Sequence, residues 1–306
     1  MGVAALTLAL SACQEDPLKD QSVITVENRT QNDFDRWLTA NFVNPYNVEI
    51  QYRYEDNETD MNYYDVPAEY DASVKLAHII KYTCIEAYDR VAGVTFTKTY
   101  FPKLFSFVGE FEYLNNGTMR LGTAEGGKKI RILGVRSRWL DQGLADRSVL
   151  DEYFLKTIHH EFVHILNQTR DYPVEFDQVT PTGYVSNDWS EETYVTGYLP
   201  RGFISAYAQK EGREDFAEMV SVYVMNSAEQ WEALLAQART ATGTDADDNP
   251  TYDTTPRRNI EMKLAIAKRY YSETFGIDLD QLRDEVVRRE NEVVAGSVNL
   301  DDLTVD

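Results

Sequence analysis

Five consecutive residues carry the clearest chemical signal in this chain: His160-Glu161-Phe162-Val163-His164, an H-E-x-x-H pattern inside a helical stretch of sequence. Residues four apart on a helix lie one turn above each other on the same face. His160 and His164 can therefore bind one Zn²⁺ ion at about 2.0–2.1 Å. Glu161, one step further round the helix, is placed to take a proton from a metal-held water and not to bind the metal.

The residues around the pattern predict a helix from Val149 to Asn167 that is buried on most sides. Two histidines on such a helix need hydrogen-bond partners or a metal. His159 points about 100° away from His160, so we interpret it as a structural or ligand-orienting residue and not as a ligand. The apolar stripe of this helix recurs at helical spacing and consists of Phe154, Ile158, Phe162 and Ile165. These apolar flanks argue against a chance H-E-x-x-H on a surface helix.

A catalytic zinc usually takes three protein ligands and keeps one open position, so a third ligand is needed. The best candidate lies in Glu214-Asp215-Phe216-Ala217-Glu218. Glu214 and Glu218 share one helical face. Glu214 can reach the metal, and Glu218 can accept the second N–H of a ligand histidine, which orients the ring. Asp215 remains a rival ligand, and the acids also suit an ordinary helix N-terminus.

H-E-F-x-H followed by E-x-F-A-E resembles the zinc site of gluzincin metallopeptidases of the anthrax lethal factor type. In that type a tyrosine precedes the third ligand by seven residues, and Tyr207 stands at this distance from Glu214. Val163 departs from the family, which often has glycine there. The resemblance covers residues 150–226. It implies His160, His164 and Glu214 as ligands, Glu161 as general base, Glu218 as the acid behind a ligand, and Tyr207 as the hydroxyl on the oxyanion side.

The first residues of the chain resemble the start of a bacterial lipoprotein. Leu10-Ser11-Ala12-Cys13 is similar to a lipobox, after which Cys13 would carry the lipid, although the usual basic residues before the apolar stretch are missing. The alternative is an ordinary apolar start with an incidental cysteine. We therefore expect residues 1–12 to be the remnant of a signal peptide and residues 13–30 to be a lipid-anchored tether.

Lipobox and zinc motifs together resemble the zinc metallopeptidase lipoproteins associated with starch-utilisation-type nutrient import. The acidic run Gln14-Glu15-Asp16 resembles surface-export signals of outer-membrane lipoproteins. The resemblance implies an outer-membrane lipoprotein at the cell surface that cleaves a peptide or protein substrate beside an import complex. The alternative function is a non-catalytic or glycan-handling accessory lipoprotein of such a complex.

Composition narrows the partners. The net charge of −21 over 306 residues repels phosphate backbones, which argues against nucleic-acid binding. No apolar run reaches a membrane-spanning length, so we expect membrane contact only through the lipid. If Cys13 is lipidated, Cys84 is unpaired and no internal disulfide forms. Cys84 lies among apolar residues of a predicted helix and reads as a small core residue.

The order of elements predicts an α+β, zincin-like domain over residues 31–306, with a mixed sheet, an active-site helix and a mainly helical C-terminal lobe. The lobes would cover about 31–168 and 206–306. Between them, Asp171 to Ser205 is long, polar and aromatic, and is either a lid or substrate wall over the cleft or a structural excursion pinned by its aromatic rings. The predicted helices are one from Phe34 to Phe42, one over Asp71–Ala92, the motif helix, and Arg213–Val294 apart from a loop at Thr242–Pro256. The predicted strands are Asn47–Tyr54, Val94–Phe96, Phe105–Leu114, Thr118–Gly122 (with the Asn116-Gly117 hairpin turn before it) and Lys128–Val135.

Overall fold

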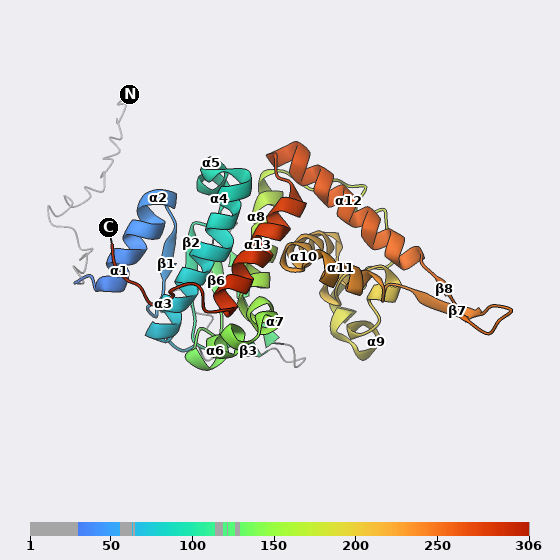
Figure 1. Cartoon of the computed structure of the whole chain (residues 1–306), viewed down its shortest axis with the longest axis horizontal. Helices are drawn as coiled ribbons and strands as arrows, with labels where there is room; N and C mark the ends of the chain where they lie inside the picture. The colour runs from blue at the N-terminus through green and yellow to red at the C-terminus, as the bar shows by residue number, and fades with distance from the viewer. Residues whose placement is uncertain are drawn as a thin grey trace, which may run out of the picture.

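A four-stranded mixed sheet forms the framework of the N-terminal half (Figure 1). The computed structural model describes residues 30–55, 63, 65–113, 119–120, 122–125 and 129–305. Cys13, the tether up to residue 29 and the Asn116-Gly117 turn lie outside the described residues. The strand order is β1 (Glu49–Gln51), β2 (Leu104–Phe107), β6 (Lys129–Ile132) and β5 (Gly122–Glu125). The first three strands are parallel, and β5 is antiparallel to β6.

Helices connect β1 to β2, as the crossover between parallel strands requires, and a further helical segment precedes β1. The predicted helix near Phe34 is confirmed, and Asn32 begins it with a capping box closed by Asp35. It comprises α1 (Asp33–Leu38), a π-helical turn η1 (Thr39–Val43) and α2 (Asn44–Tyr46). The long helix predicted over Asp71–Ala92 is also confirmed. It comprises α3 (Tyr70–Ile79), η3 (Ile80–Ile85) and α4 (Glu86–Ala92).

The strand predicted at Val94–Phe96 is wrong, because these residues begin helix α5 (Val94–Tyr100). Gly93, with φ of +85°, ends α4 and allows the chain to turn directly into a new helix. Phe96 is buried there, and its ring packs against Tyr88 and Phe162. Tertiary packing of the aromatic ring thus overrides the strand preference of the β-branched residues.

The strand predicted over Phe105–Leu114 divides into two elements that belong to different sheets. Gly109 explains the division, because a side chain there would lie 2.2 Å from the carbonyl oxygen of Pro67. Its amide donates to the carbonyl of Val66, so the chain leaves the line of the strand. The second element, β3 (Glu112–Tyr113), pairs antiparallel with β4 (Met119–Arg120), on either side of the predicted hairpin turn. The strand predicted at Asn47–Tyr54 keeps only the three residues of β1.

The motif helix is confirmed and packs against the sheet. It is preceded by α6 (Ser137–Ala145), α7 (Arg147–Leu150) and the π-helical turn η4 (Asp151–Leu155), and α8 itself spans Lys156–Thr169. Its predicted apolar stripe is buried, with Phe162 only 1% exposed. On the sheet side, Gly122 of β5 lies so close that a side chain on it would reach Thr157 Cγ2 at 2.6 Å. This contact brings β5 against the motif helix.

The C-terminal part is mainly helical, as predicted. Its elements are α10 (Gly212–Met225), α11 (Ala228–Leu235), β7 (Thr240–Thr244), β8 (Pro250–Asp253), α12 (Thr255–Phe275) and α13 (Leu279–Val294). Helix α13 packs against α10 and α4.

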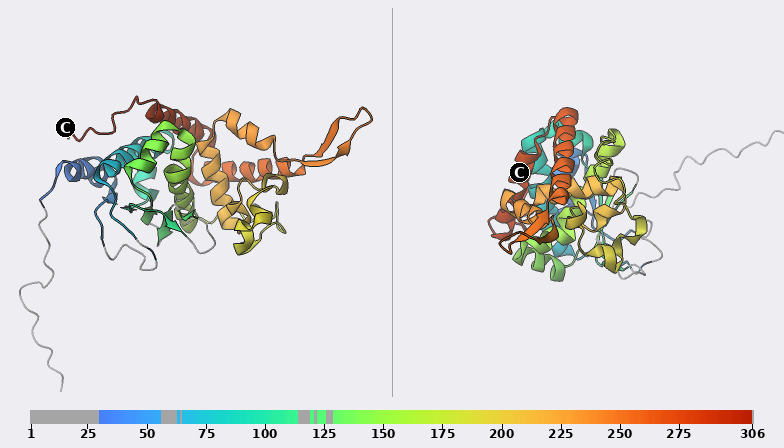
Figure 2. Two further views of the ribbon diagram at one scale, coloured as in Figure 1. Left: turned by 90° about the horizontal axis from the view of Figure 1, so that it is seen from below. Right: turned by 90° about the vertical axis from the view of Figure 1, so that its right-hand side faces the viewer.

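The loop predicted at Thr242–Pro256 is wrong, because strands β7 and β8 form an antiparallel hairpin that projects from the start of α12 (Figures 1 and 2). All residues of β7 are exposed, so the sequence shows no apolar alternation there.

One cluster of buried apolar side chains joins the two halves and extends from Phe34 to Leu300. It includes Phe162 of α8 and Phe216 of α10, so the two helices that carry the site motifs share one core. Within the described part of the chain, no helix has the length and apolar character that crossing a bilayer requires.

In the segment that precedes α8, the Arg147 guanidinium is shared by two largely buried carboxylates, Asp151 and Glu290. Arg147 Nη1 lies 3.1 Å from Glu290 Oε2, and Arg147 Nε lies 3.9 Å from Asp151 Oδ2. Glu290 Oε1 and Asp151 Oδ1 are buried with no hydrogen-bond partner among the described residues. Burial raises the pKa of Glu290 and raises that of Asp151 to about 7, despite the opposing charge of Arg147. The folded state therefore disfavours the fully ionised cluster.

We predict that Glu290→Gln stabilises the protein at alkaline pH. Because the folded-state pKa of Glu290 lies above its unfolded value, the wild type loses stability as pH rises from about 4. At pH 8 the variant should have a higher free energy of unfolding, because Arg147 keeps Asp151 as its partner, and at pH 4 the difference should vanish. Urea unfolding at both pH values measures this. Exposed Glu273→Gln is the control, and a less stable Glu290→Gln at pH 8 would contradict the prediction.

Candidate metal centre

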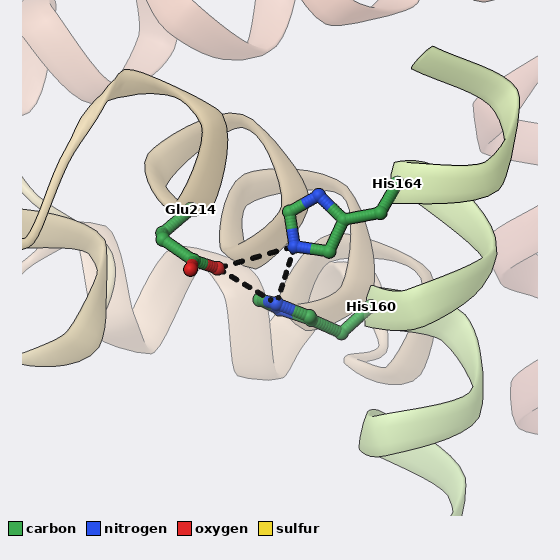
Figure 3. Close-up of side chains that lie close together, drawn as sticks. All are labelled: His160, His164 and Glu214. Atoms are coloured by element: carbon green, nitrogen blue, oxygen red, sulfur yellow. Dashed lines mark hydrogen bonds and ion pairs between the residues drawn. The ribbon is translucent and has the colours of Figure 1, made fainter. Parts of the chain in front are cut away.

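Helices α8 and α10 bring three of the predicted residues together (Figure 3). His160 Nε2, His164 Nε2 and Glu214 Oε2 lie 3.1 Å from one another in all three pairs. His160 and His164 extend from successive turns of α8, and Glu214 extends from the first turn of α10. Among the described residues this is the one group of three or more such side chains whose ligand atoms converge.

The spacing of these three atoms fits a tetrahedral metal ion. Ligand atoms bound at 2.0–2.1 Å around a tetrahedral centre lie about 3.3 Å apart. Hydrogen bonds alone suit the triangle poorly, because a protonated Nε2 on both histidines would turn two N–H groups toward each other at 3.1 Å. The donor set, two imidazoles and one carboxylate, is one that zinc accepts. His160, His164 and Glu214 could therefore hold a zinc ion.

Glu218 stands behind His160, where the sequence places it. Its Oε1 lies 2.9 Å from His160 Nδ1, although this contact is poorly aligned for a hydrogen bond. Its Oε2 accepts from Lys156 Nζ at 2.8 Å and from the Ser205 hydroxyl. Burial alone would raise the pKa of Glu218, but Lys156 and His160 outweigh it and hold the pKa well below its usual range.

Glu214 is similarly held in its ionised form. Burial would raise its pKa, but hydrogen bonds from His160, His164 and Lys210 keep the pKa far below the ordinary value. Contacts with Glu214 and Glu218 outweigh burial and raise the pKa of His160 to about 9. The carboxylates thus attract positive charge to the point where the three ligand atoms converge.

Glu161 lies beside this cluster, and its carboxylate makes no hydrogen bond or ion pair with any described residue. Burial raises its pKa, against the opposing effect of the neighbouring histidines. Tyr207 lies on η7 (Tyr207–Gln209), and its hydroxyl donates to Glu214 Oε1 at 2.9 Å. The ring of Trp189 meets Tyr207 edge-on, with centroids 4.9 Å apart. A carboxylate and a phenol therefore border the three ligand atoms.

Two neighbours of the motifs face away from the cluster. Asp215, the rival ligand, is fully buried, and its Oδ2 lies 2.6 Å from Lys263 Nζ and accepts from Tyr184 at 3.0 Å. Burial raises the pKa of Asp215 to about 6 in spite of Lys263. His159 contacts the hydroxyl of Tyr88 at 3.4 Å instead, and burial lowers the pKa of this imidazole to about 4. Asp215 and His159 therefore contact other core residues and not the three converging ligand atoms.

The aromatic segment from Asp171 to Ser205 is anchored to α10 at several points. Tyr184 donates to Asp215, and Ser205 donates to Glu218 three residues further along, so two points of the segment are held at neighbouring positions on α10. Phe176 and Phe203 are fully buried. These contacts favour the pinned excursion over a mobile lid, although Trp189 still borders the cluster. The segment contains η5 (Ser186–Ser190), α9 (Glu192–Val195) and η6 (Leu199–Arg201).

Sequence reasoning missed two lysines at the centre. Lys156 lies one turn before His160, and Lys210 lies one turn before Glu214, with Nζ 2.7 Å from Glu214 Oε1. Both precede a candidate ligand by four residues, which is the same spacing that revealed the ligands. The four-residue spacing could have pointed to both lysines. A lysine is a poor zinc ligand, however, so its type alone did not suggest a role at a metal centre.

Two histidines and a glutamate from facing helices form a group that could hold a transition metal. Residues 27–280 match the model of a family described as "Putative zinc-binding metallo-peptidase". A crystal structure described as "a putative zinc-binding metallo-peptidase from Bacteroides caccae ATCC 43185" superposes with a TM-score of 0.71 at 34% identity, covering 89% of this chain and 96% of that chain. No curated protein matches. The chain belongs to this family of zinc-binding metallopeptidases.

The neighbouring acids of α10 should separate metal binding from stability. Glu214→Ala should lose the metal and keep the fold. Asp215→Asn should keep about one zinc per chain but lower the free energy of unfolding by about 3–5 kcal/mol, because it leaves Lys263 buried without its partner. Metal analysis and urea unfolding test both variants. The opposite pattern would make Asp215 the ligand.

Proposed function

We propose that the protein is a zinc-dependent peptidase of zincin-like architecture, with His160, His164 and Glu214 as the metal ligands. The observation that carries this proposal is the convergence of their three ligand atoms at 3.1 Å, beside the Glu161 carboxylate, which makes no hydrogen bond or ion pair with a described residue. A zinc ion, when bound, polarises a substrate carbonyl and lowers the pKa of a water toward about 7. Membership of the metallopeptidase family supports hydrolysis of this kind.

Glu161 acts as the general base. It follows His160 directly, so its side chain borders the ligand atoms without joining them. Since no described residue binds its carboxylate, Glu161 is free to accept a proton from the attacking water. It then returns the proton to the leaving amine. Glu218 holds the orientation of His160 and takes no part in proton transfer.

Tyr207 supplies the hydrogen bond to the developing oxyanion. Burial and the adjacent carboxylate of Glu214 raise the pKa of this phenol, so it stays a donor at neutral pH. Its hydroxyl donates to Glu214 Oε1, within reach of the ligand atoms. A small rotation would redirect it to a substrate oxygen, where one such donor is worth about a hundredfold in rate.

The free edge of the sheet offers a place for an extended peptide. Strand β5 ends the strand order among the described residues. Its Gly122 contacts Thr157, which lies one turn before Glu161 on the same face of α8. A peptide pairing with β5 would receive main-chain hydrogen bonds and lie along the side of α8 that carries the base.

We also propose that Cys13 carries a lipid that anchors the protein to the outer membrane, facing the cell surface. The sequence Leu10-Ser11-Ala12-Cys13 and the acidic run after it support this. We propose further that the protein acts beside a nutrient import complex, and this part rests on the family resemblance. Substrates would then meet the enzyme outside the cell.

Glu161→Gln tests the catalytic proposal. The variant should retain zinc, because Glu161 is not a ligand, and should lose about 10²–10⁴-fold in peptide turnover. A peptide-library digest with zinc-loaded protein supplies the substrate for the assay. Exposed Glu152→Gln, a carboxylate in the same helical run, is the matched control. Full activity of Glu161→Gln at full zinc content would refute the role, and a zinc-loaded wild type that cleaves no peptide would refute the peptidase proposal.

Cys13→Ala tests the anchor. The variant should move from the membrane to the soluble fraction, because a single residue would hold the lipid. Protease shaving of intact cells should digest the wild type if it faces outward. Cys84→Ala is the control, because Cys84 is fully buried and its replacement should leave the protein membrane-bound. A Cys13→Ala protein that stays with the membrane would rule the anchor out.

A further inference from the structure

The two carboxylate oxygens of Glu214 have different partners. Oε2 faces His160 and His164 at 3.1 Å. Oε1 accepts hydrogen bonds from Tyr207 Oη at 2.9 Å and from Lys210 Nζ at 2.7 Å. Lys210 Nζ also donates to Tyr207 Oη at 3.1 Å. Glu214 Oε1, Tyr207 and Lys210 therefore form a closed hydrogen-bonded triangle on the side of the carboxylate that does not face the histidines.

Lys210 belongs to neither zinc motif. It follows Tyr207 by three residues and precedes Glu214 by four, so it lies between them in the chain. Its side chain is 28% exposed, and its ammonium lies 5.1 Å from the centre of the Tyr207 ring. No acidic group other than Glu214 forms an ion pair with it among the described residues. Lys210 is thus committed to the third ligand and to the phenol.

These contacts control how Glu214 can bind a metal. A carboxylate with both oxygens free can bind through both of them. Because Oε1 is held by two donors, only Oε2 remains for the ion. Binding through one oxygen leaves three protein ligand atoms and one open position, which is what a catalytic zinc requires.

The same contacts allow Tyr207 to move. If its hydroxyl turns toward a substrate oxygen, Oε1 loses one of its two donors. Without Lys210, that largely buried oxygen would be left unpaired, which is costly. With Lys210 in place, Oε1 keeps a charged donor. The Glu214 carboxylate is therefore not driven to rotate and present Oε1 to the ion.

We propose that Lys210 is a positioning residue that keeps Glu214 bound to the metal through one oxygen and releases the Tyr207 hydroxyl for the substrate. The part that concerns Tyr207 rests on the proposed peptidase function. The part that concerns Glu214 does not, because it describes a binding mode that exists before any substrate arrives.

Cobalt substitution tests the binding mode without any assay of activity. Tetrahedral Co²⁺ absorbs visible light much more strongly than five-coordinate Co²⁺, so the spectrum reports coordination geometry. The cobalt-loaded wild type should show the intense spectrum. Lys210→Met should lower the extinction severalfold at full cobalt content, and Lys210→Arg should restore it. Exposed Lys98→Met, which should match the wild type, is the control.

An unchanged spectrum in Lys210→Met would overturn the proposal. Loss of all cobalt from a folded Lys210→Met protein would overturn it too, since Lys210 would then decide whether Glu214 binds and not how. Lys210→Gln, which keeps a donor but removes the charge, replaces the methionine variant if that one does not fold. With Gln, a partial loss of extinction supports the proposal and an unchanged spectrum contradicts it.

A double-mutant cycle on a cleavable peptide tests the role toward Tyr207. Lys210→Met should lower kcat by about tenfold more when Tyr207 is present than in a Tyr207→Phe protein, where only the change in how Glu214 binds remains. Equal losses in both backgrounds would overturn this role. If the zinc-loaded wild type cleaves no peptide, the proposed function fails, while the cobalt spectra still decide the binding mode of Glu214.

Discussion

The site depends on one register between two antiparallel helices. Along α8 the basic side chains Lys156, His160 and His164 recur every four residues, and along α10 the acids Glu214 and Glu218 do the same. Lys156 pairs with Glu218, and His164 pairs with Glu214. His160, between them, contacts both acids. A slip of one residue would turn either row by about 100° and separate every pair. Phe162 and Phe216, buried in the common core, fix this register from the apolar side.

The remaining elements hold the helix pair in place. Strands β5 and β6 support α8, and α12 and α13 support α10. Lys263 of α12 reaches Asp215, which is next to Glu214 in the chain, and its ammonium also donates to the carbonyl of Gly202 at 3.1 Å. Charge buried this deeply does little for stability by itself, but it permits few alternative arrangements. The aromatic segment, α10 and α12 are therefore fixed to one another around a single residue beside Glu214.

Sequence patterns predicted the site residues that recur at helical spacing. They did not predict residues and elements whose role depends on contacts distant in the sequence. His160, His164, Glu214 and Glu218 were predictable because four-residue spacing is visible within each helix. Lys156 and Lys210 were not, because a lysine gains meaning only once the facing acid is known. Helix α5 and the β7–β8 hairpin were missed for related reasons. The conformation at Phe96 is set by packing against Phe162, which is distant in the sequence. The hairpin strands have no buried face, so their sequence shows no alternating pattern.

The two lysines have a consequence for how the protein matures. Clustered acids such as Glu214 and Glu218 would repel each other during folding if nothing balanced them. Lys210 and Lys156 already balance them, and the apolar core joins both helices without help from an ion. In small zinc modules the ion supplies the folding energy itself. If the centre holds zinc as proposed, the polypeptide can complete its fold first, and zinc loading is then a separate, later event governed by the metal supply around the folded protein.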